Sequence, residues 1–448
     1  MKKIDVLVIG GGPAGIIAAV TAKKNYPNKK IVLIREHESV VVPCGIPYIF
    51  NRLDSVKKNV MPDASLHNNK IDLIIKKVEN ILQKDKIVVL SDNSKIAYDK
   101  LILATGSKPA MIPIDGINKA GVWQIKKDFK YLEKLRRAVL KAKNIVIIGG
   151  GYIGLELAEE LSSIKGKKIS IIEKLNCCLA TTMDKEFSLL VENKLKENGV
   201  DIHTGVLVNK IEGKKSVEYV KLSNGKKVLA DLVIVSIGAK PQTDIAKEAG
   251  IKLGNYDAIK VDKHMKTNIT NVFAIGDCSE TKDFFTNNHF PVMLASTACY
   301  EARIAAVNLY RNKNLIVNNG TLASFSTSIY HTAIGAVGLN ERMAKERGFS
   351  TFTGTSECPS KHPGSLPGST KVIVKLIFSK PKGLLIGAQL AGPDCISEMV
   401  NVIALAIQKK VTIHDLNTLQ VATHPLLISA PTVYPLITAA QSALSKKN

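Results

Sequence analysis

The sequence contains little of several features that define special classes of protein. Phenylalanine, tryptophan and tyrosine make up only 5% of the 448 residues. The seven cysteines are an odd number with no CxxC pair, so they indicate neither a disulfide framework nor a zinc site. Residues 416–444 carry no Lys, Arg, Asp or Glu, but prolines interrupt them, which argues against a membrane-spanning helix. We therefore expect a folded chain with reduced thiols, located in the cytoplasm, and no metal site.

Acidic residues are scarce relative to basic ones. The chain has 39 Asp and Glu against 62 Lys and Arg, a formal net charge of +23. Such a balance normally raises nucleic acid or an anionic membrane as a partner. The lysines, however, recur as pairs from Lys2-Lys3 to Lys446-Lys447, without one dense basic tract and without interleaved aromatic residues. We predict no nucleic-acid and no membrane partner, and we interpret the charge as an attraction for phosphate-bearing small molecules.

One local pattern occurs twice. Residues 4–9 are typical of a buried strand, and a glycine turn, an apolar helix from Ala14 to about Asn25 and a strand at residues 30–34 follow. The same order returns as a strand at 144–148, glycines at 149–151, a helix at 153–163 and a strand at 168–172. Each copy predicts a βαβ unit that binds a nucleotide.

The chain changes character from about residue 322. Strands at 371–378 and 384–390, followed by a helix near 396–408, predict a separate α+β domain. The predicted fold class is therefore α/β, with two Rossmann-like dinucleotide-binding domains and a C-terminal α+β domain. The motif spacing divides the first dinucleotide-binding domain into residues 1–115 and 245–320, and it places the second at 116–244 and the C-terminal domain at 321–448.

Both glycine turns match the pattern GxGxxG. The first contains Gly10, Gly12, Pro13, Ala14 and Gly15, and the second contains Gly149, Gly151, Tyr152, Ile153 and Gly154. In such a motif the first glycine permits a tight turn, the second lets a pyrophosphate approach the backbone, and the third lets the helix pack on the strand. Two such loops, each between a strand and a helix, favour two dinucleotide sites over two turns without a ligand.

Each dinucleotide site needs an acidic residue on the following strand to bind a ribose diol. Glu173 lies 24 residues after Gly149 and favours NADH over NADPH at the second site, although Lys174 beside it weakens that preference. Glu36 lies 26 residues after Gly10 and is the candidate at the first site.

Cys44 follows the second strand, within the segment Pro43-Cys44-Gly45-Ile46-Pro47-Tyr48. At the start of a helix, free backbone N–H groups and the positive helix end would stabilise its thiolate and lower its pKa. We therefore predict that Cys44 is the reactive thiol. The other six cysteines are interpreted as small buried apolar residues; they are Cys177, Cys178, Cys278, Cys299, Cys358 and Cys395.

With these motifs in place, the chain resembles the FAD-dependent pyridine nucleotide-disulfide oxidoreductases. The similarity is to their single-cysteine branch, which holds NADH oxidases, NADH peroxidases and coenzyme A disulfide reductases. It covers nearly the whole length and rests on the following segments: Gly10 to Gly15, Cys44-Gly45-Ile46-Pro47-Tyr48, Ala104-Thr105-Gly106, Gly149 to Glu156, Gly238, Gly276-Asp277 and Gly338-Leu339-Asn340-Glu341-Arg342.

The resemblance implies FAD at the first site, NADH or NADPH at the second, and coenzyme A as a further candidate ligand. It implies that Asp277 lies near the ribityl and pyrophosphate groups and that Tyr152 covers the flavin until nicotinamide displaces it. A helix beginning near Thr297-Ala298 would point its N-terminus at the flavin, and the C-terminal domain would form a homodimer. The remaining cofactor-binding residues implied in this way are Pro43, Val78, Ala104, Thr105, Gly106, Ile153, Glu156 and Gly238.

The sequence departs from the family pattern at several positions. Ile49 occupies the place of the second cysteine of dithiol members, so Cys44 must act alone. Arg35 stands where the family usually places the ribose acid, which moves that role to Glu36. His424-Pro425 resembles the pair of the dithiol reductases, in which a partner-subunit histidine is the acid and base. Ser429 replaces their supporting Glu, so a catalytic and a structural role for His424 both remain open.

These residues suggest a mechanism in which NADH reduces FAD and the electrons pass to O2 or to an oxidised Cys44. That oxidised form would be a sulfenic acid, as in peroxide reduction, or a mixed disulfide with coenzyme A or persulfide sulfur. The main reading is an NADH oxidase type of enzyme. The alternatives are a coenzyme A disulfide or polysulfide reductase and, from another class, a flavin-bearing redox sensor or electron-transfer protein with little turnover.

Overall fold

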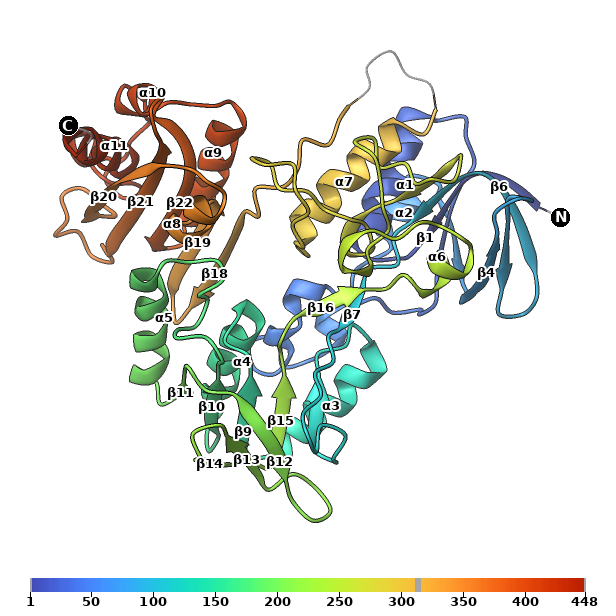
Figure 1. Cartoon of the computed structure of the whole chain (residues 1–448), viewed down its shortest axis with the longest axis horizontal. Coiled ribbons are helices and arrows are strands. Elements are labelled where there is room, and N and C mark those ends of the chain that lie inside the picture. Colours follow the sequence, from blue (N-terminus) through green and yellow to red (C-terminus); the bar gives the residue numbers. More distant parts are fainter. Residues whose placement is uncertain (1, 311–315, 447–448) are drawn as a thin grey trace. The chain divides into compact units, whose positions relative to one another are not determined.

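The computed structural model describes residues 2–310 and 316–446 (Figure 1). The chain divides into two compact units, which are considered one at a time. The first comprises the chain up to Pro113 together with Trp123–Lys141 and Ile237–Thr321, and the second comprises Ile114–Val122, Ala142–Ser236 and the chain from Leu322 onward. The three-domain boundaries expected from the sequence stay a prediction beside this division.

A mostly parallel sheet forms the centre of the first unit, with strand order β3-β2-β1-β6-β5-β4 and β17 paired to β6. Its strands are β1 Lys2–Ile9, β2 Ile31–Arg35, β3 Asp72–Ile75, β4 Val78–Leu82, β5 Ile87–Leu90, β6 Lys95–Leu103 and β17 Val272–Ala274. Strands β1, β2, β3, β6 and β17 pair in parallel, whereas β4, β5 and β6 pair antiparallel. The parallel strands are apolar on both faces because each face is covered.

Helices α1 (Pro13–Asn25) and α7 (Ala295–Val307) pack against each other beside this sheet. Their contact faces are rich in buried alanine, which lets two helix backbones approach closely. The other elements of the first unit are η1 Pro43–Gly45, η2 Pro47–Ile49, η3 Lys57–Asn59, α2 Ala64–Asn68, β7 Ser107–Pro109, α3 Phe129–Lys141, β16 Ala239–Pro241, α6 Asp244–Glu248, η4 Asn255–Asp257 and η5 Gly276–Cys278.

The second unit contains a parallel sheet of order β11-β10-β9-β15. These strands are β9 Asn144–Ile148, β10 Lys168–Ile172, β11 Asp201–His203 and β15 Leu232–Val235. Helices α4 (Tyr152–Ser162) and α5 (Lys185–Glu197) follow β9 and β10. The nearby β8 is Val122–Gln124, and an antiparallel group consists of β12 Val208–Glu212, β13 Tyr219–Leu222 and β14 Lys227–Leu229.

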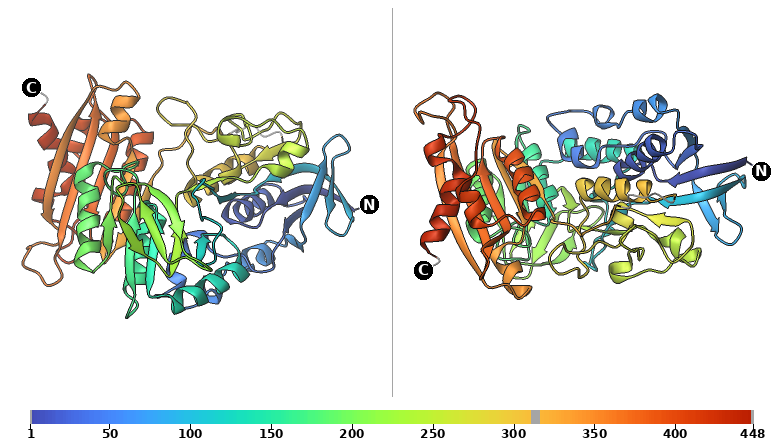
Figure 2. Two further views of the ribbon diagram at one scale, coloured as in Figure 1. Left: turned by 60° about the horizontal axis from the view of Figure 1, so that its bottom comes forward. Right: turned by 90° about the horizontal axis from the view of Figure 1, so that it is seen from above.

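The C-terminal part of the second unit is an antiparallel sheet of order β18-β19-β22-β21-β20. Its strands are β18 Phe325–Ile329, β19 Thr332–Gly338, β20 Thr351–Pro359, β21 Lys371–Ser379 and β22 Leu384–Gly392. Helix α9 (Ile396–Gln408) packs on β19 and β22, and α11 (Pro435–Ser445) packs on β20 and β21, as Figure 2 shows. Short elements complete this part: α8 Glu341–Glu346, α10 Ile413–Asn417 and η6 Pro431–Val433.

These elements confirm the predicted α/β fold class, including both βαβ units. The predicted helix at 396–408 coincides with α9, and the predicted helix from Ala14 begins one residue later than α1. Among the described residues no helix has the length and apolar character needed to cross a membrane.

Candidate functional site

The first glycine loop has the shape of a phosphate cradle. Gly10 has φ +117°, and a Cβ on it would lie 2.1 Å from the carbonyl oxygen of Ala104. A Cβ on Gly15 would lie 1.9 Å from the oxygen of Gly10, so both positions exclude any larger side chain. A Cβ on Gly12 would instead meet no atom of the described residues within 4 Å. The backbone is thus open at Gly12, directly before Pro13 begins α1.

The second glycine loop repeats this geometry. Gly149 has φ +112°, and a Cβ on Gly154 would lie 2.0 Å from the Gly149 oxygen. Around Gly151 the described part of the chain again places no atom within 4 Å of an added Cβ. Helix α4 then begins at Tyr152, and Ile153 beside it is 45% exposed. Both loops therefore leave room for a ligand phosphate at the middle glycine and a helix N-terminus beside it.

The acid of the second site is held in place by the backbone. Glu173 follows β10 and is 9% exposed. Its Oε2 accepts the N–H of Gly150 at 2.6 Å, and its Oε1 accepts the N–H of Leu175 at 2.8 Å. These bonds fix a carboxylate beside the glycine loop, where the ribose of a dinucleotide is recognised in such folds.

An arginine takes the corresponding place in the first unit. The N–H of Gly10 bonds to Ile34 and the N–H of Gly149 bonds to Ile172, so Arg35 and Glu173 are structural equivalents. Arg35 is 5% exposed, and its guanidinium donates to Asp63 at 2.5 and 2.8 Å and to backbone oxygens of the following turn. Glu36 follows at the surface.

The Asp277 carboxylate of the first unit accepts hydrogen bonds from two side chains. It lies in η5, and its Oδ2 accepts from the Ser107 hydroxyl at 2.6 Å and from Lys127 Nζ at 2.9 Å. Sequence reasoning missed both partners. The position of Ser107, immediately after the Ala104-Thr105-Gly106 motif, was the one available signal. Lys127 belongs to no recognisable motif. Because it lies 150 residues from Asp277 in the sequence, sequence reasoning could not identify this contact.

The other glycine motifs of this unit also leave backbone open. Gly106 has φ +73° and Gly238 has φ +105°, and an added Cβ on either would contact nothing within 4 Å among the described residues. The Thr105 hydroxyl donates to the Gln242 oxygen at 2.6 Å, which ties this turn to the strand β16 region. Ala104 is buried under Gly10, and Val78 begins β4.

Cys44 lies on a short turn and not on a longer helix. It is exposed in η1, and η2 follows from Pro47. The predicted helix is thus only a three-residue 3-10 turn. Because Pro43 and Pro47 lack N–H groups, the backbone here offers few N–H groups to a thiolate. A Cβ on Gly45 would lie 2.0 Å from Asn59 Oδ1, so a larger residue here would displace the Asn59 side chain.

The charge of Cys44 acts on Cys299 of α7. Burial raises the pKa of the Cys299 thiol, Arg303 lowers it, and the charge of Cys44 raises it further. Thr297 and Ala298 precede Cys299 on the same helix and are buried, with the Thr297 hydroxyl 3.1 Å from that of Thr321. This electrostatic interaction links the predicted reactive thiol to the predicted flavin-facing helix.

The remaining cysteines differ in burial. All seven lie in the described part of the chain and none forms a disulfide. The buried thiols are Cys177, Cys178, Cys278 and Cys358, as expected. Cys299 is half-buried, and Cys395 is exposed at the start of α9, so the buried interpretation is wrong for Cys395.

In the second unit, strand β18 covers one face of α4. The Tyr152 hydroxyl donates to Thr182 Oγ1 at 2.7 Å, and its ring centroid lies 4.1 Å from that of Phe325. Glu156, one turn along α4, accepts from the Thr327 hydroxyl at 2.6 Å. Burial raises the pKa of Glu156 to about 7, although the Thr327 bond lowers it. The C-terminal segment thereby holds the two predicted nicotinamide-site side chains of α4.

His424 lies on an exposed loop of the second unit. Its Nδ1 accepts the N–H of Leu426 at 3.3 Å, which places the ring proton on Nε2 in the neutral form. Within the described residues no carboxylate partners it, and Ser429 instead receives a hydrogen bond from the Cys358 thiol at 3.4 Å. Because Cys44 belongs to the first unit, the catalytic role of His424 stays a prediction.

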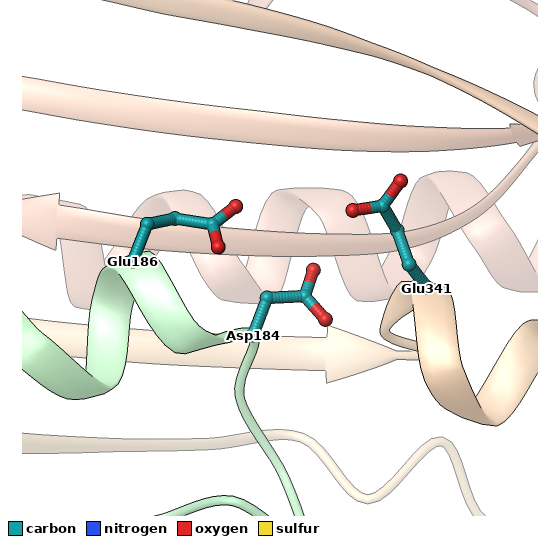
Figure 3. A group of neighbouring side chains, drawn as sticks. All are labelled: Asp184, Glu186 and Glu341. Carbon is teal, nitrogen blue, oxygen red and sulfur yellow. The ribbon is translucent and has the colours of Figure 1, made fainter. Parts of the chain in front are cut away.

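Three carboxylates of the second unit, Asp184, Glu186 and Glu341, point toward one another (Figure 3). Lys375 of β21, whose side chain is 5% exposed, lies among them, with its Nζ 2.8 Å from Asp184 and 2.5 Å from each glutamate. These hydrogen bonds raise the pKa of Lys375 against the opposing effect of burial. An ammonium group therefore occupies the position a metal ion would take.

Comparisons with known proteins identify the family of the chain. The sequence model described as pyridine nucleotide-disulphide oxidoreductase matches residues 4–324, and the model of the dimerisation domain of the same proteins matches residues 325–433. The chain therefore belongs to the pyridine nucleotide-disulphide oxidoreductase family. It is an enzyme, and the family uses FAD and NAD(P)H.

Several relatives are similar over most of the chain. An NAD(P)H coenzyme A polysulfide/persulfide reductase of Pyrococcus horikoshii is 32% identical over 88% of both chains. An NADH oxidase of Methanocaldococcus jannaschii is 29% identical over 98% of both. The solved structure of an NAD-dependent persulfide reductase from A. fulgidus is 30% identical, with a TM-score of 0.91, over 99% of this chain and 84% of that one.

Proposed function

We propose that the protein is an FAD-dependent NADH oxidoreductase of the NADH oxidase type, which passes two electrons to O2, peroxide or a disulfide through Cys44. The observation that carries this proposal is the exposed thiol of Cys44, whose charge acts on Cys299 of α7, in the unit that contains the Gly10 to Gly15 cradle. A protein with one reactive thiol cannot form an internal disulfide there, so the acceptor must be oxygen or bind Cys44 covalently.

The residues present fit both cofactors. In the first unit, the open backbone at Gly12 suits the FAD pyrophosphate, and the Asp277 carboxylate suits a hydroxyl donor such as the ribityl chain. In the second, Gly151 and Glu173 suit the pyrophosphate and ribose diol of NADH. Bound FAD would accept a hydride and pass on its two electrons, either one at a time or as a pair. Glu36, which is exposed directly after Arg35, is the proposed ribose contact of the first site.

Cys44 provides the covalent chemistry. Its thiolate attacks one sulfur of a disulfide, forms a mixed disulfide and releases the other sulfur as a thiolate. Two electrons from NADH then cleave the mixed disulfide, which restores the Cys44 thiolate and releases the second thiolate of the substrate. With peroxide, the thiolate takes one oxygen as a sulfenic acid and releases hydroxide, and two electrons then restore the thiolate with loss of a second hydroxide.

A coenzyme A disulfide, polysulfide or persulfide reductase is the second candidate. The names of the Pyrococcus horikoshii relative and the A. fulgidus structure favour it. Mass spectrometry of the intact, unreduced protein separates the two candidates. Coenzyme A on Cys44 adds a large mass that thiols remove, whereas a sulfenic acid adds one oxygen.

The test is an anaerobic titration followed by a comparison of acceptors. NADH should bleach the yellow protein, and NADH oxidation should then be measured with O2, H2O2, coenzyme A disulfide and polysulfide. A colourless protein that FAD does not reconstitute would contradict the proposal.

The Cys44→Ser variant tests the thiol. Turnover of peroxide and disulfides should fall by about 10³-fold or more, because the attacking thiolate is lost, while flavin bleaching by NADH persists. The matched control is Cys395→Ser, which removes an exposed thiol from the other unit. Full turnover in the Cys44 variant would reject Cys44 as the redox centre.

We also propose a homodimer in the cytoplasm. The dimerisation-domain match at residues 325–433 and the exposed Leu426 and Leu427 beside His424 support the dimer, in which His424 would serve the partner subunit's site. The seven cysteines form no disulfide with one another, which is consistent with a reducing location.

A further inference from the structure

A buried glutamate lies under the Gly276-Asp277 turn of the first unit. Glu301, on the second turn of α7, is 1% exposed. Its Oε2 accepts the N–H of Gly276 at 2.8 Å and the hydroxyl of Ser279 at 3.1 Å. One carboxyl group therefore binds both ends of η5, the element that carries Asp277.

The turn has little freedom to adopt another position. Gly276 has φ +70°, and a Cβ on it would lie 3.1 Å from the Cβ of Ala14 and 3.3 Å from that of Ala298. The turn is thus enclosed by the first residues of α1 and α7, and Glu301 binds it from below. Any change in the state of Glu301 must act on the turn and on the direction of Asp277.

Glu301 also has a counterpart in the other unit. Glu173 accepts the N–H of Gly150 with a buried carboxylate, as Glu301 does with Gly276. The equivalent position in the first unit is Arg35, which cannot accept a hydrogen bond. Among the described residues of the first unit, Glu301 is the buried carboxyl group that accepts a hydrogen bond from a glycine N–H of a predicted cofactor motif.

The protonation of Glu301 is sensitive to its surroundings. Burial raises its pKa to about 8, the two hydrogen bonds lower it, and the negative charge of Asp277 raises it further. The other charged and titratable groups nearby are Lys127, which binds Asp277, and Tyr300, whose own pKa the charge of Glu301 raises.

We propose that Glu301 is a positioning residue for FAD, which orients the Gly276-Asp277 turn and makes the retention of FAD depend on pH. The inference rests on the proposed FAD site. FAD brings two phosphate charges to this region, so the bound cofactor favours the neutral, protonated form of Glu301. By linkage, FAD is held most tightly below the pKa of Glu301 and is released more readily as the pH rises through that value.

The experiment follows the release of FAD from the diluted holoenzyme by flavin fluorescence between pH 6 and 9.5. For the unaltered protein, the release rate should rise by about threefold or more across the interval that contains the Glu301 pKa. In Glu301→Gln, which retains an oxygen acceptor but does not ionise, the rate should be nearly independent of pH. Ser279→Ala should release FAD faster at every pH and keep the pH dependence, because Glu301 still titrates.

Three results would overturn the inference. They are a flat profile in the unaltered protein, an undiminished pH dependence in Glu301→Gln, and a Ser279→Ala variant without any pH dependence. If Glu301→Gln does not fold, the pH profiles of FAD release from the unaltered protein and from Ser279→Ala still test the inference. Failure of the proposed function is seen separately, as a protein that does not bind FAD or that NADH does not bleach.

Discussion

At the scale of single residues, the two glycine loops differ in the side chain that lies against Gly11 in the first loop and Gly150 in the second. Glu173 offers a carboxylate fixed by two backbone N–H groups, whereas Arg35 is fully engaged by Asp63 and neighbouring backbone oxygens. The same loop geometry is therefore combined with opposite charges. The negative charge of Glu173 suits a ribose diol and repels a 2′-phosphate, which predicts a preference for NADH at the second site.

Glu173→Gln tests that preference. The amide oxygen keeps a hydrogen-bond acceptor near Gly150 but loses the charge, so the ratio of kcat/KM for NADH to that for NADPH should fall by about tenfold. Steady-state kinetics with both nucleotides measures it. Lys174→Gln, an exposed neighbour, is the control and should move the ratio in the opposite direction. An unchanged ratio in Glu173→Gln would show that another residue discriminates.

At the scale of elements, α5, α8 and β21 meet at one cluster of charges. Lys375 of β21 is bound by Asp184 at the start of α5, by Glu186 one residue into that helix and by Glu341 at the start of α8. Acidic side chains at helix N-termini are stabilised by the positive helix end, and the ammonium group adds to this. Removing the lysine would leave three carboxylates facing one another.

Lys375→Met should therefore lower the free energy of unfolding by about 3 kcal/mol, the lower end for a broken buried ion pair, because both glutamates are about half exposed. Urea unfolding at pH 7 measures it. Lys371→Met is the matched control on the same strand. Its pair with Glu357 is exposed, so it should cost less than about 1 kcal/mol. Equal losses in the two variants would contradict the buried-pair argument.

At the scale of the whole molecule, several large apolar side chains of the matched dimerisation domain are exposed. Leu426 and Leu427 are 55% and 72% exposed on the loop of His424, and Val402 and Leu405 are 52% and 56% exposed on α9. Neighbouring exposed apolar residues, such as Leu426 and Leu427, are typical of a surface covered by a partner. The position of Leu426 and Leu427 beside His424 supports the proposed homodimer, in which this loop would be buried.

Leu427→Glu should weaken that dimer by about tenfold or more, since a charge would be placed in an apolar interface. Sedimentation velocity over a range of concentrations measures the dissociation. Leu207→Glu is the control, because Leu207 is 56% exposed outside the dimerisation domain. A dimer of unaltered strength in Leu427→Glu would remove this loop from the interface.

Much of this protein was determined by local sequence alone. The glycine loops, α1 and α9 follow from short-range rules of apolar periodicity and close packing, and the structure confirms them. At Cys44 the predicted helix is limited to a three-residue 3-10 turn, because Pro47 follows and cannot continue it.

Only the tertiary structure decided which distant groups surround the predicted site residues. Ser107 and Lys127 reach Asp277 across 170 and 150 residues of chain, and Glu301 reaches Gly276 from a neighbouring helix. None of these partners belongs to a motif, because their role requires only one donor or acceptor at the right place. Such contacts depend on how strands and helices pack, and no local spacing encodes them.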